Sequence, residues 1–353
     1  MSRLLVQSSG GMTYAGAGVS IEAGDEVIGR IKSAVASTTR SEVLGGIGGF
    51  AGMFALNTEK YKEPVLVASA DGVGTKLEVA RLAGRYDTVG VDLVAMLVDD
   101  LACVGAEPLF LLDYVAVGSL DPARIEELVG GIAVGCRRAR VALLGGETAE
   151  HGGVMKPDDL DVAGFAVGVV ERGEELGASR VREGDALIGF GSPGLRSNGY
   201  TLARRILIAD GADLSEPAFA GSSRTLAEEL LTPSVIYAPT VTTLREELGG
   251  AIHAVAHVTG GGIMGNVIRL LPENFDAVID MTSFETPEIF FEIQRRGQVG
   301  SDEMVRVFNC GLGMVVALDA SGAEAAITLA RAAGVTSSVV GEIRLGSAKV
   351  ILT

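Results

Sequence analysis

Residues 65–76, Val-Leu-Val-Ala-Ser-Ala-Asp-Gly-Val-Gly-Thr-Lys, hold the pattern that decides the fold. The stretch opens with aliphatic residues typical of a buried strand and then passes through Asp71 and two glycines. The apolar residues after Lys76 recur at helical spacing. The pattern therefore predicts a strand, a tight loop and the beginning of a helix.

The loop in this stretch has the features of a phosphate site. Gly72, Gly74 and Thr75 would present backbone N–H groups at a helix start, with the positive charge of Lys76 beside them. Asp71 would be repelled by phosphate oxygens unless a divalent cation lay between them. We therefore predict a metal–nucleotide site, with a plain glycine turn and a surface lysine as the alternative. The order glycine, threonine, lysine lacks the Gly-Lys-Ser/Thr ending of a P-loop, which excludes that motif.

The size and composition of the chain predict two α/β domains with mixed sheets. At 353 residues the chain exceeds the usual size of a single core. A hydrophobic content of 48%, 49 glycines and only 5% aromatic residues favour an α/β architecture over a disordered or all-β one. We expect a mobile tail over residues 1–13, an N-terminal domain over 14–170 and a C-terminal domain over 171–353, because the charged run at 171–175 marks a boundary.

Charge and cysteine content exclude several classes of protein. A net charge of −16 argues against nucleic acid or anionic lipid as the main partner, since both require a basic face. No apolar run approaches the ~20 residues of a membrane span, and the N-terminus has no secretory pattern. The three cysteines have neither disulfide nor zinc spacing, which favours a reducing cytoplasm.

Carboxylates on an apolar helix predicted from residue 92 to residue 105 point to a buried charge site. Asp92 and Asp99 are two helical turns apart and share a face, and Asp100 follows directly. Such carboxylates are costly unless they are paired, hydrogen-bonded or bound to a metal. We therefore expect at least one of them to meet a cation.

A further carboxylate is predicted at the end of a strand. Glu147 follows a short strand expected at residues 141–144, and Asp71 has the same kind of position after its own strand. In α/β sheets the carboxyl ends of strands hold ligand chemistry. Two acids at two strand ends favour a shared metal site.

Glycine-rich segments supply the other candidate ligand loops. The run at residues 45–50 follows a helix predicted over 25–37, and a polar segment rather than a strand precedes it, so a Rossmann NAD site is excluded. It would be either a mobile flap over phosphates or a flexible linker. In the second half, residues 197–199 (Ser-Asn-Gly) and 259–262 (Thr-Gly-Gly-Gly) each precede a predicted helix and could bind anions. His257 is expected to be a satisfied histidine at a strand end.

These motifs, taken in order, resemble the phosphoribosylformylglycinamidine cyclo-ligase family, the aminoimidazole ribonucleotide synthetases. The matching blocks are residues 45–50, 71–76, 92–96, 105–110, 145–150, 197–200, 259–262 and 308–314. The resemblance implies two α/β domains and a homodimer in which the N-terminal sheets join. It also implies Mg²⁺ and ATP as cofactors and formylglycinamidine ribonucleotide as substrate, which would be closed to an imidazole after phosphorylation of its formyl amide oxygen.

The resemblance also assigns site residues. Asp71, Asp100 and Glu147 fall on the family's acidic positions and are the expected metal ligands, and Asp71 and Lys76 are the expected catalytic residues. The expected nucleotide-binding residues are Lys32, Gly45, Gly46, Gly48, Gly49, Gly72, Gly74, Thr75 and Lys76. The expected substrate-binding residues are Ser197, Asn198, Gly199, Thr259, Gly260, Gly261 and Gly262.

Three positions depart from the family's usual pattern. Residues 151–153 read His-Gly-Gly where Met-Pro-Gly usually stands, Arg196 stands where a histidine is common, and Asp99 replaces a usual asparagine. If that histidine is the proton acceptor in relatives, this chain needs another base. The additional charge of Asp99 is expected to alter metal affinity.

Related families with the same architecture suggest alternative functions for this chain. Selenophosphate synthetases need a reactive cysteine or selenocysteine near the N-terminal glycine loop, whereas the first cysteine here is Cys103. A related hydrogenase maturation protein ends in a cysteine, and this chain ends in Thr353. A small-molecule kinase and a catalytically silent nucleotide-binding scaffold remain as alternatives.

Overall fold

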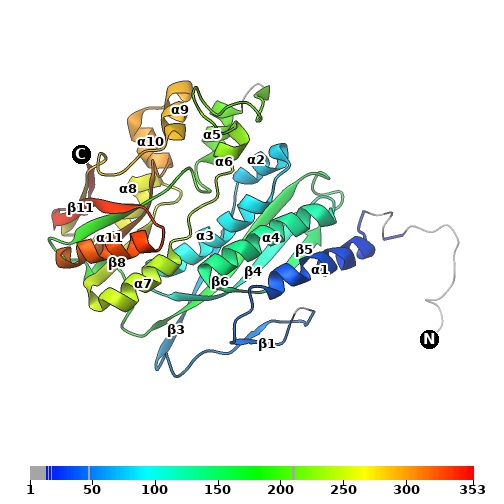
Figure 1. Cartoon of the computed structure of the whole chain (residues 1–353), viewed down its shortest axis with the longest axis horizontal. Helices are drawn as coiled ribbons and strands as arrows, with labels where there is room; N and C mark the ends of the chain where they lie inside the picture. The colour runs from blue at the N-terminus through cyan, green and yellow to red at the C-terminus, as the bar shows by residue number, and fades with distance from the viewer. Residues whose placement is uncertain (1–12, 15, 17, 47, 209–210) are drawn as a thin grey trace.

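The computed structural model describes residues 13–353 except 15, 17, 47, 209 and 210 (Figure 1). The tail predicted over residues 1–13 lies, apart from Thr13, outside the described residues. The described chain forms two mixed sheets with helices, so the predicted α/β class is confirmed.

The N-terminal half is built on a four-stranded sheet in the order β3-β6-β4-β5. Its strands are β3 (Pro64–Gly72), β4 (Glu107–Val117), β5 (Ala142–Glu150) and β6 (Leu160–Glu171). β6 is antiparallel to β3 and β4, whereas β4 and β5 are parallel. The carboxyl ends of β3, β4 and β5 therefore meet at the same end of the sheet.

Helices cover one face of this sheet (Figure 1). They are α1 (Ile21–Ala36), α3 (Asp87–Cys103) and α4 (Pro122–Ala139), while the short α2 (Lys76–Ala83) follows β3. A small hairpin of β1 (Val43–Leu44) and β2 (Met53–Phe54) precedes β3. The strand, loop and helix start predicted from residues 65–76 are confirmed, with Gly72 ending the strand and Lys76 beginning the helix.

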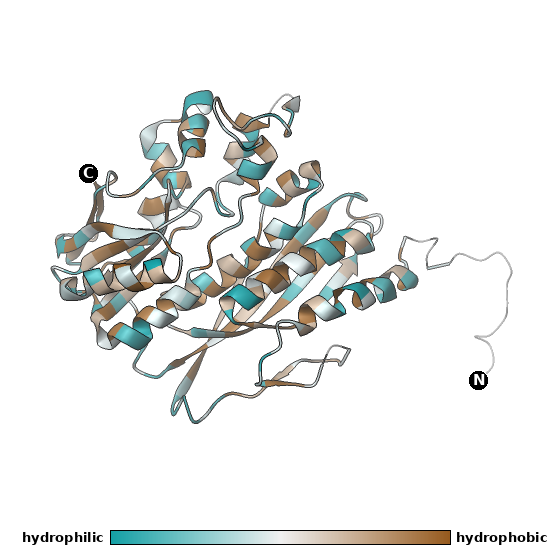
Figure 2. Cartoon of the chain, viewed as in Figure 1, coloured by the Kyte–Doolittle hydropathy of each residue, from teal (hydrophilic) through white to brown (hydrophobic). Residues whose placement is uncertain are grey.

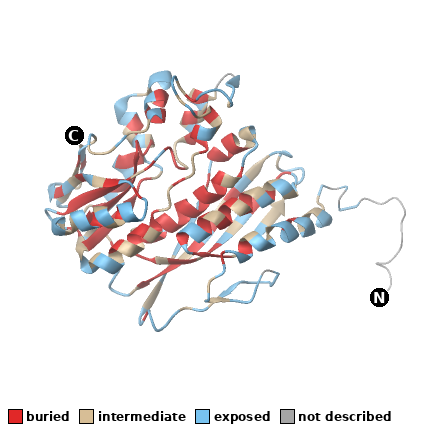
Figure 3. Cartoon of the chain, viewed as in Figure 1, coloured by how far each residue is buried: buried red, intermediate tan, exposed pale blue. Residues whose placement is uncertain are grey.

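The opposite face of the sheet is apolar and exposed. Leu66, Leu112, Tyr114 and Phe165 alternate with less exposed neighbours along their strands and are between 37% and 64% exposed. Figure 2 shows apolar residues along these strands, and Figure 3 shows the sheet in the colours of partly buried and exposed residues behind the buried helices. An exposed apolar patch of this kind marks an interaction site.

The C-terminal half contains a six-stranded sheet in the order β12-β9-β11-β7-β10-β8. Its strands are β7 (Ala186–Gly191), β8 (Ile252–His257), β9 (Phe275–Ile279), β10 (Leu312–Leu318), β11 (Ser337–Leu345) and β12 (Val350–Leu352). All neighbouring pairs are antiparallel except β12 with β9. Its helices are α5 (Tyr200–Leu207), α6 (Leu226–Leu230), α7 (Ala238–Leu248), α8 (Gly262–Val267), α9 (Glu288–Gly297), α10 (Ser301–Val307) and α11 (Ala323–Ala332).

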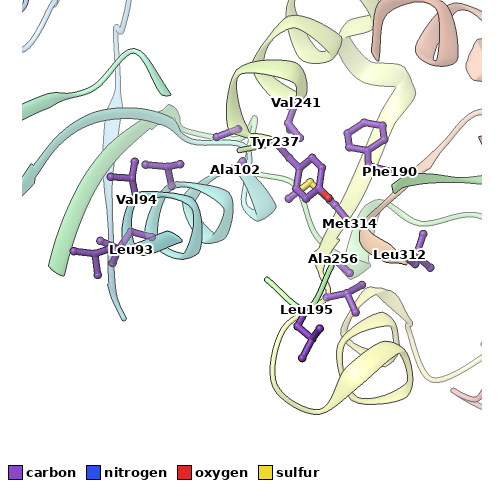
Figure 4. Packing of buried hydrophobic residues seen from close by; sticks show 14 of the residues in the cluster. Leu93, Val94, Ala102, Phe190, Leu195, Tyr237, Val241, Ala256, Leu312 and Met314 are labelled. Carbon is purple, nitrogen blue, oxygen red and sulfur yellow. The ribbon is translucent and has the colours of Figure 1, made fainter. Parts of the chain in front are cut away.

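Helix α3 connects the two halves. It packs on α4, β3 and β6 of the N-terminal half and also contacts α7 and β8 of the C-terminal half. Figure 3 shows it as almost entirely buried, which explains why its sequence is apolar on all sides. In the core close-up, Tyr237 beside α7 lies next to Phe190 of β7, with ring centroids 5.8 Å apart (Figure 4).

Three predicted boundaries were wrong. The helix expected from residue 92 to residue 105 is α3, which begins at Asp87 and ends at Cys103. The first helix begins at Ile21 rather than Asp25, because the Ser20 hydroxyl accepts a hydrogen bond from the Ala23 amide and caps it. The strand expected at residues 141–144 continues to Glu150, because its second half pairs with β4. Among the described residues, no helix combines the length and apolar character needed to cross a membrane.

Candidate active site at the domain junction

Asp71 lies at the carboxyl end of β3, where the chain turns into α2. Its carboxylate accepts a hydrogen bond from the Gly72 amide at 2.7 Å. Gly74 has a φ of +67°, a conformation that glycine adopts without strain. Thr75 follows and its hydroxyl lies 3.1 Å from that of Thr201 in α5. The loop thus reaches from the N-terminal sheet to the C-terminal half.

Asp100 lies close to Asp71 and carries the second carboxylate of the junction. Desolvation raises the pKa of Asp71, and the negative charge of Asp100 raises it further, while the Gly72 hydrogen bond opposes both. Asp100 Oδ1 lies 2.9 Å from Nδ1 of His257, at the end of β8. No Lys or Arg side chain in the described part of the chain forms an ion pair with either carboxylate. Two neighbouring carboxylates without a cationic side chain have the donor chemistry of a Mg²⁺ site.

Lys76 is buried between α2 and the C-terminal half. Its side chain is fully buried, and Nζ forms an ion pair with Asp92 at 2.6 Å. The same ammonium donates to the backbone carbonyls of Arg196 at 3.0 Å and Thr232 at 2.8 Å. The Lys76 ammonium thus donates to two carbonyls and pairs its charge with Asp92. In this arrangement Lys76 ties α2 to the C-terminal half, and its phosphate-binding role stays a prediction.

Glu147 is separated from Asp71 within one chain. The two residues lie on β5 and β3, at opposite edges of the sheet, about 14 Å apart for three spacings of ~4.8 Å. Glu147 pairs with Tyr114 on the exposed apolar face, whereas Asp71 lies on the face covered by α3. Within one chain the strand order therefore separates two strands that are equivalent in sequence pattern, and the shared metal site of the two acids stays a prediction.

The prediction that an acid of α3 meets a cation is confirmed twice. Asp92 binds Lys76, and Asp99 Oδ2 binds the guanidinium of Arg196 at 2.8 Å. Both carboxylates also accept backbone amides of the C-terminal half, Asp92 from Ser234 and Asp99 from Tyr237. The apolar sequence of α3 predicted buried carboxylates. It did not predict their partners, because Lys76 lies on another helix and Arg196 is more than 90 residues away.

The two predicted substrate loops lie side by side. A Cβ built at Gly260 would lie 3.6 Å from the side-chain oxygen of Asn198. Gly199 and Gly261, with φ of +76° and +95°, precede α5 and α8. The Asn266 amide donates to the carbonyls of three residues of the second loop, Thr259, Gly260 and Gly262. The hydroxyl of Ser197 is buried without a hydrogen-bond partner among the described residues.

The glycine loop at residues 45–49 borders a separate cavity. The cavity has a volume of about 420 Å³ and is lined by α1, Gly48, Gly49 and the β5 segment from Gly145 to Thr148. Its size lies within the usual range for small-molecule pockets. Lys32 is on α1 but exposed and outside the lining. Gly45 and Gly46 are among the described residues, whereas Ile47 is not.

Sequence comparison places the chain among characterised proteins. Two family models match it: AIR synthase related protein, N-terminal domain, over residues 51–170, and AIR synthase related protein, C-terminal domain, over residues 182–351. The phosphoribosylformylglycinamidine cyclo-ligase of Trichlorobacter lovleyi is 48% identical over 94% of this chain and 95% of its own. That of Magnetococcus marinus is 46% identical over 98% of both chains.

Structure comparison finds the same fold in more distant proteins. Thiamine-monophosphate kinase from Stenotrophomonas maltophilia K279a has a TM-score of 0.69 at 22% identity, covering 93% of this chain and 95% of that one. Hydrogenase maturation protein HypE in complex with ATP has a TM-score of 0.63 at 17% identity, covering 92% and 90%. At these identities the likeness concerns the fold alone. The near-complete matches at 46–48% identity show that the chain belongs to the phosphoribosylformylglycinamidine cyclo-ligase family.

Proposed function

We propose that the protein catalyses the ATP-dependent ring closure of formylglycinamidine ribonucleotide to 5-aminoimidazole ribonucleotide, a ligase reaction of purine biosynthesis. The observation that carries this proposal is the identity of 48% over 94% of the chain with a protein of that name. The junction between the two halves supplies carboxylates and glycine loops of the kinds that the reaction needs.

The proposed reaction has two chemical steps. The γ-phosphoryl group of ATP passes to the formyl amide oxygen, and an amidine nitrogen then attacks the activated carbon. The C–O bond breaks, phosphate leaves and the imidazole ring closes. Catalysis of phosphoryl transfer depends mainly on positioning and on compensating charge. The protein must therefore hold two phosphate-bearing ligands in contact.

The carboxylates of Asp71 and Asp100 would hold Mg²⁺ at the domain junction. Desolvation is the main cause that raises the pKa of Asp71, and the negative charge of Asp100 adds to it; a divalent cation bound between the two carboxylates would relieve this repulsion. When bound, Mg²⁺ would offset negative charge on the transferring phosphoryl group. Asp71 is placed by the end of β3, and Asp100 is held by its hydrogen bond to His257.

Backbone amides would bind the phosphates in this proposal. Residues 72–75 face the C-terminal half through Thr75 and Thr201, and the loops at 197–199 and 259–262 lie beside each other there. The nucleotide base would occupy the cavity between α1 and the glycine loop at residues 45–49, with Lys32 at the exposed surface of α1. ATP use is also supported by HypE, a protein of the same fold in complex with ATP.

We also propose that the protein acts as a homodimer through the exposed apolar face of the N-terminal sheet. Leu66 and Phe165 on that face are 64% and 51% exposed, which favours burial against a second copy. Glu147 lies on the same face, so its metal-binding role requires the partner protomer. The three free cysteines fit the reducing cytoplasm as the site of action.

One assay separates this function from its alternatives. The purified protein is given formylglycinamidine ribonucleotide with Mg²⁺ and ATP, and ADP and the aminoimidazole product are followed. The proposed function predicts equal amounts of both. A phosphorylated product without ring closure would identify a small-molecule kinase, and nucleotide binding without turnover would identify a scaffold.

Subunit mixing tests whether Glu147 serves a site shared by two protomers. Asp71→Asn and Glu147→Gln protomers are each expected to be inactive as homodimers. If the two residues act from different protomers, random re-pairing restores about a quarter of the sites, because half of the dimers are mixed and each has one intact site. Mixtures that stay inactive, although re-pairing is demonstrated by mass, would show that the residues do not share a site in this way.

A further inference from the structure

We propose that Asp99 and Arg196 form a matched pair of positioning residues that sets the tautomer of His257 and, through it, the orientation of Asp100. This inference goes beyond the proposed function, and only its activity measurements rest on that function. Asp99 and Asp100 lie on α3, whereas Arg196 precedes α5 and His257 ends β8 in the C-terminal half.

The carboxylate of Asp99 is fully buried and fully used. Oδ1 accepts the backbone amides of Tyr237 at 2.7 Å and Ala238 at 2.8 Å, at the start of α7. Oδ2 accepts the Arg196 guanidinium at 2.8 Å. A buried carboxylate with three charge-assisted or backbone donors has a defined position. Asp99 therefore holds Arg196 in one place relative to α3.

Arg196 is itself buried and constrained. It is 1% exposed, has a φ of +62°, donates from NH1 to the Val235 carbonyl at 2.8 Å, and stacks 4.7 Å from the centre of the Tyr237 ring. A positive φ in a residue other than glycine is held only where the surroundings over-determine it. The guanidinium therefore cannot turn toward a ligand without breaking the pair.

The two hydrogens of NH2 set the chemistry of His257. One donates to Asp99 Oδ2, and NH2 also lies 2.8 Å from Nε2 of His257. A guanidinium nitrogen donates and does not accept. Nε2 of His257 must therefore carry the lone pair, and the ring hydrogen must be on Nδ1.

The tautomer of His257 determines its hydrogen bond to Asp100. The hydrogen on Nδ1 of His257 donates to Asp100 Oδ1 at 2.9 Å, which fixes one oxygen of a carboxylate that is otherwise 45% exposed. The hydrogen bonds run in one direction, from Arg196 to His257 and from His257 to Asp100. Loss of the guanidinium donor would leave the imidazole free to take the other tautomer and release Asp100.

Asp99 and Arg196, which both depart from the family's usual pattern, contact each other directly. Arg196 without Asp99 would be an unpaired buried cation, and Asp99 without Arg196 an unpaired buried anion, and each is strongly unfavourable. A neutral asparagine and histidine at these positions would contain no buried charge. The two replacements are therefore expected to be tolerated together and not separately.

The tautomer can be read directly by NMR in the whole protein without substrate or nucleotide. The chain has only three histidines, so long-range ¹H–¹⁵N correlation of the imidazole rings gives three patterns, and the His257→Asn variant identifies the one that matters. At neutral pH we expect a protonated Nδ1 and an unprotonated Nε2 for His257. A hydrogen on Nε2, or a doubly protonated ring, would overturn the proposal even if the protein proves not to be a cyclo-ligase.

Variants test the pairing. Asp99→Asn and Arg196→His alone should each raise the Mg²⁺ concentration for half-maximal activity by about 10- to 100-fold, the usual loss for residues that orient metal ligands. The double variant should recover the stability that either unpaired buried charge costs, because it contains neither charge, while its Mg²⁺ requirement stays raised, because the guanidinium donor to His257 is absent. Arg205→His, on the exposed side of α5, is the matched control and should behave as wild type.

A purely structural pair would give a different result. In that case the single variants would lower the melting temperature while the folded fraction kept the wild-type Mg²⁺ dependence and the wild-type His257 pattern. Additive losses of melting temperature in the double variant would equally contradict a matched pair. If a single variant fails to fold, the wild-type NMR pattern and the double variant still decide the question.

Discussion

Asp71 is the single residue on which the proposed metal site depends most directly. Asp71→Asn keeps the shape of the side chain and its hydrogen bond to Gly72 and removes only the charge. We expect the fold to be unchanged and kcat to fall roughly 10²- to 10³-fold, the loss typical of removing one group that stabilises transition-state charge. Turnover assays over a range of Mg²⁺ concentrations measure the effect.

The matched control for Asp71 is Asp158→Asn, because Asp158 is an exposed aspartate outside the junction. It should retain wild-type turnover. Normal activity and normal Mg²⁺ dependence in the Asp71 variant would show that Asp71 is not a metal ligand.

The carboxyl group of Asp113 leads to a prediction of how the stability of the protein depends on pH. It lies within β4 between Gly146 and Gly164 of the neighbouring strands, and desolvation raises its pKa to about 7. An aspartate in the unfolded chain has a pKa of about 3.9. Between these values the native state holds a proton that the unfolded state has lost, so stability falls as pH rises from about 4 to about 7.

Asp113→Asn should remove this pH-dependent loss. The variant is expected to melt several degrees above wild type at pH 8 and close to the wild-type temperature near pH 4, where the native carboxyl is protonated and about half of the unfolded chains still hold the proton. Thermal unfolding between pH 4 and pH 8 measures the difference. A constant offset between the two proteins across this range would show that Asp113 does not titrate as described.

At the scale of elements, alanine substitutions at two adjacent glycines of α4 distinguish the effect of packing on stability from the effect of helix propensity. A Cβ at Gly131 would overlap the backbone carbonyl of Asp87 at the start of α3, whereas Gly130 has no heavy atom within 4 Å of such a Cβ. Gly131→Ala should destabilise the protein by about 2 kcal/mol through overpacking. Gly130→Ala should stabilise it by about 0.5–1 kcal/mol, because alanine favours the helix.

Denaturant unfolding of both alanine variants provides the comparison, since they differ by one position in the same helix. Equal stabilities would contradict the close contact of α3 and α4. The absence of a side chain at Gly131 allows the backbones of α3 and α4 to approach closely at this point.

The glycine loop at residues 45–49 gives the second prediction for an element. If it closes over the nucleotide, its backbone amides should exchange hydrogen more slowly when ATP and Mg²⁺ are added. Hydrogen exchange followed by mass spectrometry measures the change, with an exposed segment of the C-terminal half as internal reference. Equal exchange with and without nucleotide would leave the loop as a linker.

For the whole molecule, the apolar sheet face predicts the oligomeric state. Phe165→Asp places a charge on that face and should convert the proposed homodimer to a monomer with reduced activity. Phe291→Asp is the control, because Phe291 is 49% exposed on α9 in the other half. Sedimentation analysis measures the mass of each protein. A Phe165→Asp variant that remains dimeric would show that this face is not the dimer interface.

The strand–loop–helix at residues 65–76 and the fold class could be predicted because they depend on local patterns. Apolar periodicity decides which residues can be buried on one element, and the glycines after Asp71 decide where the strand ends. The carboxylates of α3 were also detectable, because a helix so apolar must compensate any charge it buries. Each of these inferences uses residues close together in the chain.

The positions of Lys76, Glu147 and His257 show what local patterns cannot decide. Lys76 lies in a loop typical of phosphate binding, yet its charge is used by Asp92 and two carbonyls of the other half. Glu147 and Asp71 end similar strands, yet the strand order places them at opposite edges. His257 gave no signal of its contact with Asp100, 157 residues away.

The sequence by itself therefore determined the fold class, the family and the types of residue available for the site. Only the tertiary structure decided which charges face each other, because hydrogen-bond and ion-pair partners depend on strand order and on how the two halves meet at α3. The pairing of Asp99 with Arg196 is the clearest case. In the sequence they are two unrelated substitutions 97 residues apart, and in the folded chain they are one buried contact at 2.8 Å.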